Sequence, residues 1–191
     1  MKPNAVDEFW FAGPSGDERG HLRKVWFVKD AKFDAEIRQR FLAVYEAAAD
    51  GKLARWAETA RGALALVVVL DQFPRNLFRD TPRAFANDAK ALALAKQAIS
   101  DNFDQAVLPV ERLFFYLPFE HSEVITDQEI AVTLIEALAA KHTGMDGLVD
   151  YARRHHAVVA RFGRFPHRNP ILGRASTAEE IEFLKQPGSS F

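Results

Sequence analysis

The stretch that decides the fold is Leu148-Val-Asp-Tyr151-Ala-Arg-Arg-His155-His-Ala-Val158-Val-Ala-Arg-Phe162-Gly-Arg-Phe-Pro166. Its apolar residues recur at spacings of three and four, which predicts an α-helix with one buried side. The helix must end near Gly163 and Pro166, because glycine favours a left-handed C-cap and proline lacks an amide and clashes with the preceding turn. The predicted stripe consists of Leu148, Tyr151, Ala152, His155, Val158, Val159 and Phe162.

The loop that follows this helix is strongly basic. Residues 151–178 contain no Asp or Glu, but they hold six arginines and three histidines: Arg153, Arg154, Arg161, Arg164, Arg168, Arg174, His155, His156 and His167. The whole chain of 191 residues has a formal net charge of −1. A loop this basic needs an anionic partner, either carboxylates of the protein or a ligand.

The N-terminal half also reads as helices. Residues 6–11 are predicted to form a short helix and residues 24–28 an extended lead-in. Asp30 is the predicted N-cap of a helix that Gly51 closes, with a buried stripe of Phe33, Ile37, Phe41, Val44, Tyr45 and Ala48. Residues 53–72 predict a second helix that Pro74 stops. Pro82 begins a third, with a stripe of Phe85, Ala89, Leu92, Ala95, Lys96 and Ile99.

The C-terminal half continues the pattern. A helix is predicted from residue 109 to 117, with Pro118 as its end. Thr126 and Glu129 have the spacing of a capping box for a helix with Ile130, Leu134, Ile135 and Leu138 on its stripe. Two overlapping capping boxes, from Ser176 and Thr177 to the two glutamates at 179 and 180, precede a last helix. We therefore expect an all-α fold of seven or eight antiparallel helices in a bundle or stack, as one domain over residues 1–191 with a lead-in at 1–29 and a tail at 187–191.

Composition narrows the function classes. Zero Cys rules out disulfides, thiolate nucleophiles and Cys-ligated metals. The longest apolar run, residues 63–70, is far shorter than the about 20 residues that span a bilayer, and the N-terminus lacks the apolar core of a signal peptide. We expect a soluble, cytoplasmic protein. The balanced charge argues against nucleic acid as a partner.

Two segments of the chain resemble each other. Leu70-Asp71-Gln72-Phe-Pro-Arg75-Asn76 and Phe162-Gly-Arg164-Phe-Pro-His167-Arg168-Asn169 both follow an apolar helix with Phe-Pro and then Arg-Asn. Proline favours an extended conformation for the preceding residue, so both segments are predicted as extended exits from a helix. Either the two loops converge on one pocket, or both are ordinary helix ends whose arginines bind carbonyls and carboxylates. Asp71 is the expected partner of an arginine in the second loop.

A third polar segment, Pro118-Phe-Glu120-His121-Ser-Glu123, suits a general base or a hydrogen-bond acceptor pair. His-x-Glu alone is a weak metal signal, because zinc needs three or four ligands. His155 is expected to be a core residue, although burial and a nearby carboxylate would shift its pKa in opposite directions. The candidate catalytic residues are His121, Glu123 and His167. The candidate ligand-binding residues are Asp71, Gln72, Arg75, Asn76, His155, Arg161, Arg164, Arg168, Asn169 and Arg174.

These blocks, together with Leu172-Gly-Arg-Ala-Ser-Thr177, resemble a bacterial family catalogued as domain of unknown function 924, over nearly the whole chain. The resemblance implies an all-helical, tetratricopeptide-like fold and no activity. Two hypotheses follow from the sequence. In the first, the loops bind a small anion, a phosphate or a carboxylate, with His and Glu available for acid–base chemistry. In the second, the protein is a helical adaptor for a peptide or protein, and its loop arginines are structural. No cofactor or metal is predicted.

Overall fold

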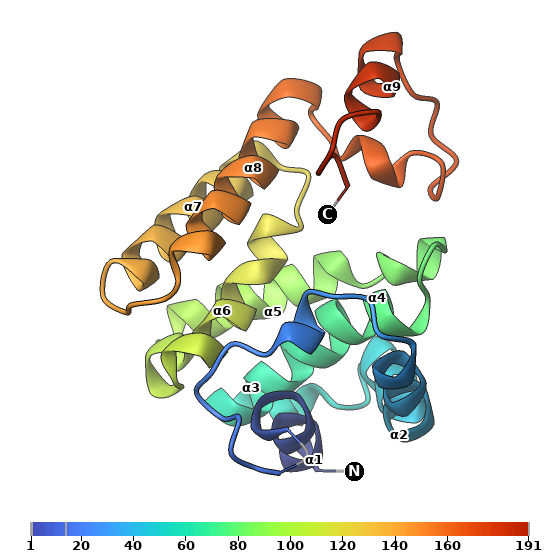
Figure 1. Ribbon diagram of the computed structural model, residues 1–191. Coiled ribbons are helices and arrows are strands. Elements are labelled where there is room, and N and C mark those ends of the chain that lie inside the picture. Colours follow the sequence, from blue (N-terminus) through green and yellow to red (C-terminus); the bar gives the residue numbers. More distant parts are fainter. Residues whose placement is uncertain (1, 14, 191) are drawn as a thin grey trace. The chain divides into compact units, whose positions relative to one another are not determined.

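Figure 1 shows the computed structural model, in which residues 2–13 and 15–190 are described. Across these residues the regular structure is helical and contains no strand, which confirms the predicted all-α fold. The chain divides into two compact units. Unit 1 is Met1–Arg79 with Arg83–Pro118, and unit 2 is Asp80–Pro82 with Phe119–Phe191. The single domain and the tetratricopeptide-like description stay predictions.

Unit 1 holds the N-terminal helices. They are α1 (Pro3–Asp7), which runs into a π-helical turn (Glu8–Ala12), α2 (Ala31–Ala49), α3 (Ala60–Val67), which runs into a second π-helical turn (Val68–Gln72), α4 (Phe73–Leu77), α5 (Asp88–Ser100) and most of α6 (Pro109–Glu120). Single 3₁₀ turns lie at Lys24–Trp26, Ala54–Glu58, Pro82–Ala84 and Phe103–Ala106. The core is aromatic: the ring of Trp10 packs edge-on against Phe73 and Phe114, with centroids 5.6 and 5.8 Å away.

The predictions for α2 are confirmed, and those for the following helices need correction. The carboxylate of Asp30 accepts hydrogen bonds from the amides of residues 32 and 33, and the predicted stripe of α2 is buried. The second helix does not begin at residue 53, because Thr59 caps it and the preceding turn is 3₁₀. Pro74 does not stop it either. The π-helical turn leads directly into α4, where the proline occupies the first turn and its missing amide is not needed.

Two further predictions for unit 1 are wrong. Residues 24–26 form a 3₁₀ turn instead of an extended lead-in. The helix expected at Pro82 begins at Asp88, after a 3₁₀ turn. Its buried side consists of Ala91, Ala95 and Ala98. This side is rotated about the helix axis by about one residue relative to the predicted stripe. This side consists of small side chains, and α5 contacts α3.

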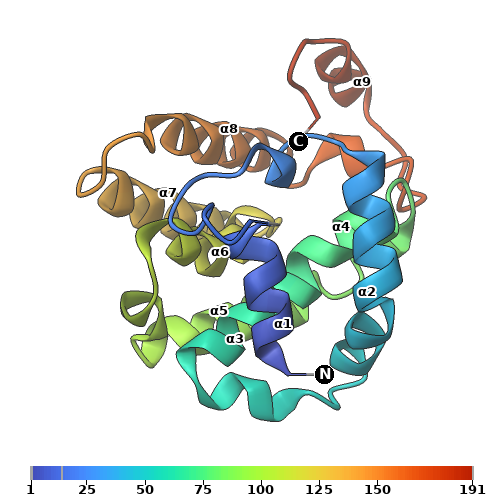
Figure 2. The same cartoon turned by 60° about the horizontal axis from the view of Figure 1, so that its bottom comes forward.

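Unit 2 contains the end of α6, then α7 (Ile125–Ala139), α8 (Asp146–Phe162), a 3₁₀ turn (Pro166–Arg168) and α9 (Ala178–Leu184). Figures 1 and 2 show α7 and α8 side by side as an antiparallel pair. Pro118 lies inside α6 and does not end it. The predicted capping box of Thr126 and Glu129 is wrong, because Val124 is the N-cap and no side chain caps α7. Ile130 is 42% exposed, and the buried apolar residues of α7 are Ala131, Ile135 and Leu138.

The helix α8 follows its sequence pattern except at Tyr151, which is 42% exposed, so the prediction that Tyr151 belongs to the buried stripe is wrong. His155, Val158 and Val159 are buried, and Gly163 ends the helix in the left-handed region with φ 68°. The second of the two predicted capping boxes is confirmed at α9. There the Thr177 hydroxyl accepts from the Glu180 amide and the Glu180 carboxylate accepts from the Thr177 amide. These two helix ends fix where the basic segment, residues 163–177, leaves α8 and enters α9.

Candidate functional site

The basic segment of unit 2 is organised around the ring of Phe165. After Gly163 the backbone becomes extended at Phe165, with φ −89° and ψ 108°, as expected for a residue before proline. The 3₁₀ turn of residues 166–168 follows at once. The Phe165 ring is fully buried and packs with Val158 and Val159 of α8. The helix core therefore anchors the loop at this residue.

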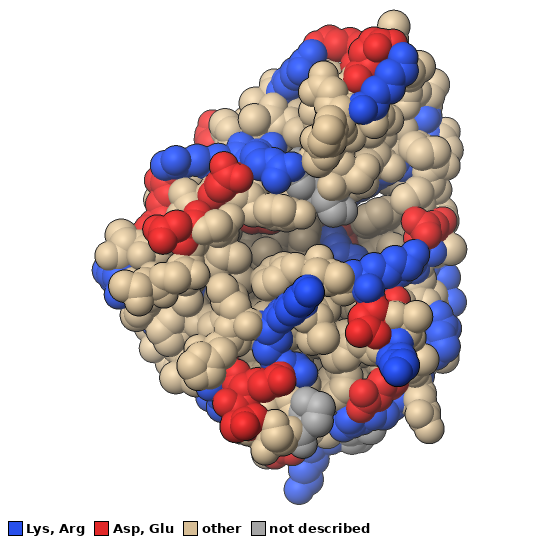
Figure 3. Space-filling model, in the orientation of Figure 1, with Lys and Arg blue, Asp and Glu red and all other residues tan. Residues whose placement is uncertain are grey.

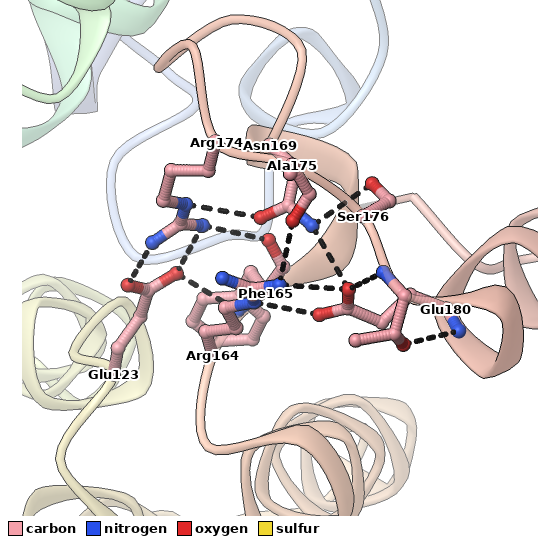
Figure 4. Close-up of polar contacts among 9 residues, drawn as sticks. Glu123, Arg164, Phe165, Asn169, Arg174, Ala175, Ser176 and Glu180 are labelled. Carbon is pink, nitrogen blue, oxygen red and sulfur yellow. Dashed lines mark hydrogen bonds and ion pairs between the residues drawn. The ribbon is translucent and has the colours of Figure 1, made fainter.

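An ion pair holds both polar backbone groups of Phe165 (Figure 4). Glu123, from the turn between α6 and α7, accepts the Phe165 amide through Oε1 at 2.8 Å. Arg174 donates to Oε2 and Oε1 of Glu123 at 2.6 and 2.9 Å, and its Nη2 also donates to the Phe165 carbonyl at 3.1 Å. We call this arrangement the Glu123–Arg174 clasp. It fixes the residue from which the 3₁₀ turn starts.

A second ion pair lies at the start of α9. Arg164 donates from Nε and Nη2 to the two carboxylate oxygens of Glu180 at 2.6 and 2.8 Å. The amide of Asn169 donates to the same carboxylate at 3.3 Å and to the Ser176 hydroxyl at 3.0 Å. The hydrogen bond from Arg164, which outweighs burial, lowers the pKa of Glu180 to about 2. Glu180 is therefore ionised at neutral pH and joins both ends of the segment.

Most of the predicted ligand-binding residues of the second loop contact protein groups in these pairs. Arg164 and Arg174 are paired with carboxylates, and the Asn169 carboxamide oxygen accepts from Arg174 Nε at 3.0 Å. Arg161 pairs with Glu179 on the surface, where both side chains are more than half exposed. The anionic partners that the basic loop required are thus largely protein carboxylates. On the face shown in Figure 3, Lys and Arg side chains lie among Asp and Glu side chains.

The remaining polar groups gather around the buried ring. The guanidinium carbon of Arg168 lies 4.5 Å from the Phe165 ring centroid, and the rings of His155 and His167 have centroids 5.5 and 5.7 Å from it. Glu120, at the end of α6, is the next neighbour, with its Oε1 3.4 Å from His155 Nδ1. His121 follows it in the chain and is near enough for its charge to act on His155. We call His121, His155, His167 and Arg168 the His–Arg cluster. His155 and Arg168 are buried, whereas His121 and His167 are partly exposed.

The expectation that His155 is a core residue is confirmed. Its Nδ1 lies 2.9 Å from the Tyr151 carbonyl oxygen, so the neutral ring donates a hydrogen bond within α8. Burial is the main cause that lowers the pKa of His155, and the positive charges of His121, Arg168 and His167 act in the same direction. The hydrogen bond to the Tyr151 carbonyl opposes this lowering of the pKa. We expect a neutral His155 at physiological pH.

The hydrogen bonds of Glu123 bear on the general-base role considered above. Its burial would raise its pKa, but the hydrogen bonds from Arg174 and the Phe165 amide, with the charges of Arg174 and Arg168, lower it. A carboxylate with a lowered pKa is a weak base at neutral pH. The geometry thus favours Glu123 as a positioning residue, and its participation in catalysis stays a prediction.

The first Arg-Asn segment lies in unit 1 and has another conformation. Phe73 is helical, with φ −58° and ψ −39°, so the segment is a helix and the predicted extended exit is wrong. Arg75 forms a bidentate pair with Asp88 at 3.0 Å and lies 3.5 Å from Asp71 Oδ1. Gln72 donates to Asp71, and Asn76 donates to Asp34 at 2.8 Å. The pairing of Asp71 with an arginine of the basic loop stays a prediction.

Sequence reasoning missed Phe165 as the centre of the site and Glu180 as an ion-pair partner. The capping-box spacing of Glu180 was visible, but nothing in the sequence indicated that one carboxylate would serve both the cap and Arg164. Within residues 2–13 and 15–190, no group of three or more His, Asp or Glu residues is placed to hold a metal ion. In the same residues, no helix is long and apolar enough to cross a membrane.

Comparisons with known proteins place the chain in a family. Residues 6–188 match the model of a family described as bacterial protein of unknown function (DUF924). The chain belongs to this family. A solved structure from Agrobacterium tumefaciens, also titled as a protein of unknown function, is 41% identical, with a TM-score of 0.84 and 96% of both chains covered. No curated protein sequence matches significantly. The resemblance noted from the sequence is confirmed, and the family supplies no activity.

Proposed function

We propose that unit 2 of this DUF924 protein binds a small anion, a phosphate or a carboxylate, at the His–Arg cluster. The observation that carries the proposal is the grouping of one guanidinium and two imidazoles around a single buried ring, Phe165. The third imidazole, His121, is near enough for its charge to act on His155. Arginine suits this role because its planar fork forms paired, charge-assisted hydrogen bonds with carboxylate and phosphate oxygens.

The surrounding ion pairs support the proposal because they hold the backbone of the His–Arg cluster in place. The Glu123–Arg174 clasp holds the backbone before the turn, and the Arg164–Glu180 pair joins its two ends to α8 and α9. Arg168 also stacks on Phe165, which restricts its long side chain. Groups that are already ordered lose little conformational entropy on binding, so a small ligand needs fewer contacts for a given affinity.

Any acid–base chemistry at this site would fall to His121 and His167. Histidine has an unperturbed pKa of about 6.5 and changes charge near neutral pH. Both of these side chains are partly exposed, whereas His155 is buried and donates to Tyr151. Glu123 is a weaker candidate, because Arg174 and the Phe165 amide stabilise its ionised form.

The test is anion binding by the intact chain. Isothermal titration calorimetry with inorganic phosphate and with malonate would compare the wild type with Arg168→Gln and the matched control Arg161→Gln. Both variants remove one positive charge, but Arg161 lies on the surface in an exposed pair with Glu179. We expect the control to bind like the wild type and Arg168→Gln to lose at least tenfold in affinity while keeping its helical circular dichroism. Equal binding by a folded Arg168→Gln variant, or no binding of either anion by the wild type, would overturn the proposal.

The adaptor hypothesis is the second candidate, and one set of observations favours it. Arg164 and Arg174 pair with protein carboxylates, as expected if the loop arginines are structural. In addition, α7 carries a shallow groove of about 330 Å³ lined by Thr126, Glu129, Ile130, Thr133 and Leu134. Such a groove suits a peptide that offers apolar side chains and a basic residue near Glu129. If a peptide of this kind binds and Ile130→Asp abolishes it, while anions do not bind, the adaptor is the better account.

A further inference from the structure

The helix α7 is apolar on two sides. On one side Ala131, Ile135 and Leu138 are buried, and α8 runs along the helix (Figure 2). On the other side Ile130 is 42% exposed and lines the shallow groove together with Leu134. A surface helix normally carries apolar residues on one side, whereas a helix that is apolar around most of its circumference is normally covered on more than one side. The exposed side of α7 therefore suits a second protein surface.

The exposed side forms a continuous stripe at helical spacing, which we call the α7 stripe. It consists of Thr126, Ile130, Thr133, Leu134, Ala137 and Lys141. Leu134 is partly exposed and the other five residues are exposed. The Thr133 hydroxyl, at the centre of the stripe, donates to the Glu129 carbonyl at 2.9 Å. A partner that covers the centre of the stripe therefore leaves this hydroxyl hydrogen-bonded.

The two ends of the α7 stripe carry opposite charges. Glu129 lines the groove near the start of the stripe, and Lys141 lies one turn beyond Ala137 at its end, with both charged side chains exposed. Two antiparallel copies of α7, centred between residues 133 and 134, bring Glu129 of each copy to within about 5 Å, along the helix axis, of the partner's Lys141. The same arrangement sets Ile130 against the small side chain of the partner's Ala137. Parallel copies would instead bring like charges together.

We propose that the α7 stripe binds a second copy of this chain, as an antiparallel two-fold dimer. The proposal goes beyond the anion site and does not depend on it. A two-fold interface has to be self-complementary, and the stripe meets this condition because its ends differ in charge and its large apolar residue faces a small one. Antiparallel packing also places the positive N-terminal end of each helix beside the negative C-terminal end of the other.

The dimer is expected to be reversible. One pair of helices buries less surface than a standard protein–protein interface, so the dissociation constant should lie in about the micromolar range. The interface includes the groove of the adaptor hypothesis, so a second copy and a peptide would compete for it. Sedimentation velocity of the full chain, from about 1 to about 300 µM, should show the wild type passing from monomer to dimer.

The first variant, Ile130→Asp, places an unpaired charge at the centre of the interface. We expect the dissociation constant to rise at least about tenfold, with unchanged circular dichroism because the residue is exposed in the monomer. The matched control is Ile181→Asp on α9, the same substitution at a residue that is 48% exposed, and it should dimerise like the wild type. A wild type that stays monomeric over the whole range, or a dimer that Ile130→Asp leaves unchanged, would overturn the proposal.

Charge reversal tests the antiparallel register. Glu129→Lys alone and Lys141→Glu alone each set like charges against one another twice, so each variant should dimerise less than the wild type. An equal mixture of the two variants should recover dimerisation, because every Glu129–Lys141 position then again holds opposite charges. Weak association in the mixture would refute the antiparallel arrangement. A monomeric wild type whose groove binds an apolar, basic peptide in an Ile130-dependent way would refute the dimer and favour the adaptor.

Discussion

The Glu123–Arg174 clasp should be the main electrostatic support of the basic segment, and Arg174→Ala tests this. The substitution removes two charge-assisted hydrogen bonds to Glu123 at 2.6 and 2.9 Å, and one each to Asn169 and the Phe165 carbonyl at 3.0 and 3.1 Å. It also leaves Glu123 without its cation. A hydrogen bond to a charged group contributes about 1.5–3 kcal/mol, and loss of a fully buried partner costs about 3–5 kcal/mol. Because the two side chains are 25% and 28% exposed, water replaces part of the loss. We expect a cost of about 2–4 kcal/mol.

The matched control is Arg161→Ala, which removes an ion pair of similar length between side chains that are 51% and 61% exposed. Exposed pairs contribute about 0–1 kcal/mol. Urea unfolding should be followed by far-ultraviolet circular dichroism, since Trp10, Trp26 and Trp56 all lie in unit 1 and their fluorescence would not report unit 2. If Arg174→Ala costs no more than Arg161→Ala, the clasp does not hold the segment. In the double variant with Glu123→Ala, the costs should be less than additive.

Three further predictions concern stability. The pKa of Glu180 is lowered to about 2, so its ionised form stabilises the fold above the unfolded pKa near 4.3, and this contribution is lost as pH falls towards 2. In an acid titration, the Glu180→Gln variant should therefore lose less stability over this pH range than the wild type. A loss of stability equal to that of the wild type would contradict the assignment. Glu111 is fully buried and paired with Arg19 and Arg61. Glu111→Ala should therefore lower the free energy of unfolding in urea by about 3–5 kcal/mol. A decrease below about 1 kcal/mol would show that these ion pairs are dispensable. A Cβ at Gly62 would lie 2.0 Å from the Trp56 carbonyl oxygen, so Gly62→Ala should lower the thermal midpoint. A Cβ at Gly147 would have no heavy atom within 4 Å, so Gly147→Ala should raise the midpoint slightly. Equal midpoints of the two variants would refute the packing argument.

The sequence predicts best where structure depends on neighbours along the chain. The Asp30 cap, the buried stripe of α2 and the left-handed Gly163 follow from side-chain chemistry within one or two helical turns, and all three are confirmed. The predictions fail where a helix end depends on contacts from elsewhere. At the start of α7, Gln128 turns back to bond the carbonyls of Glu120 and Ser122, an arrangement that no local pattern reveals.

The prolines show why the prediction failed for one of the two similar segments and held for the other. Pro74 follows a π-helical turn, whose altered hydrogen bonding places the proline in the first turn of α4, where its missing amide costs nothing. Pro166 follows a left-handed glycine, which has already ended α8, and there the extended exit is confirmed. The same four residue types therefore adopt different conformations. The second segment builds the His–Arg cluster around Phe165.

The most direct test of the central claim is to locate an anion in a crystal of the wild-type protein. Selenate, a tetrahedral dianion, can be found by its anomalous scattering. We expect an anomalous peak in unit 2 within hydrogen-bond distance of the Arg168 guanidinium and of the His167 or His121 ring, and we expect it to be absent from crystals of Arg168→Gln. Peaks confined to other surfaces at a selenate concentration that saturates binding in solution would contradict an anion site at the His–Arg cluster.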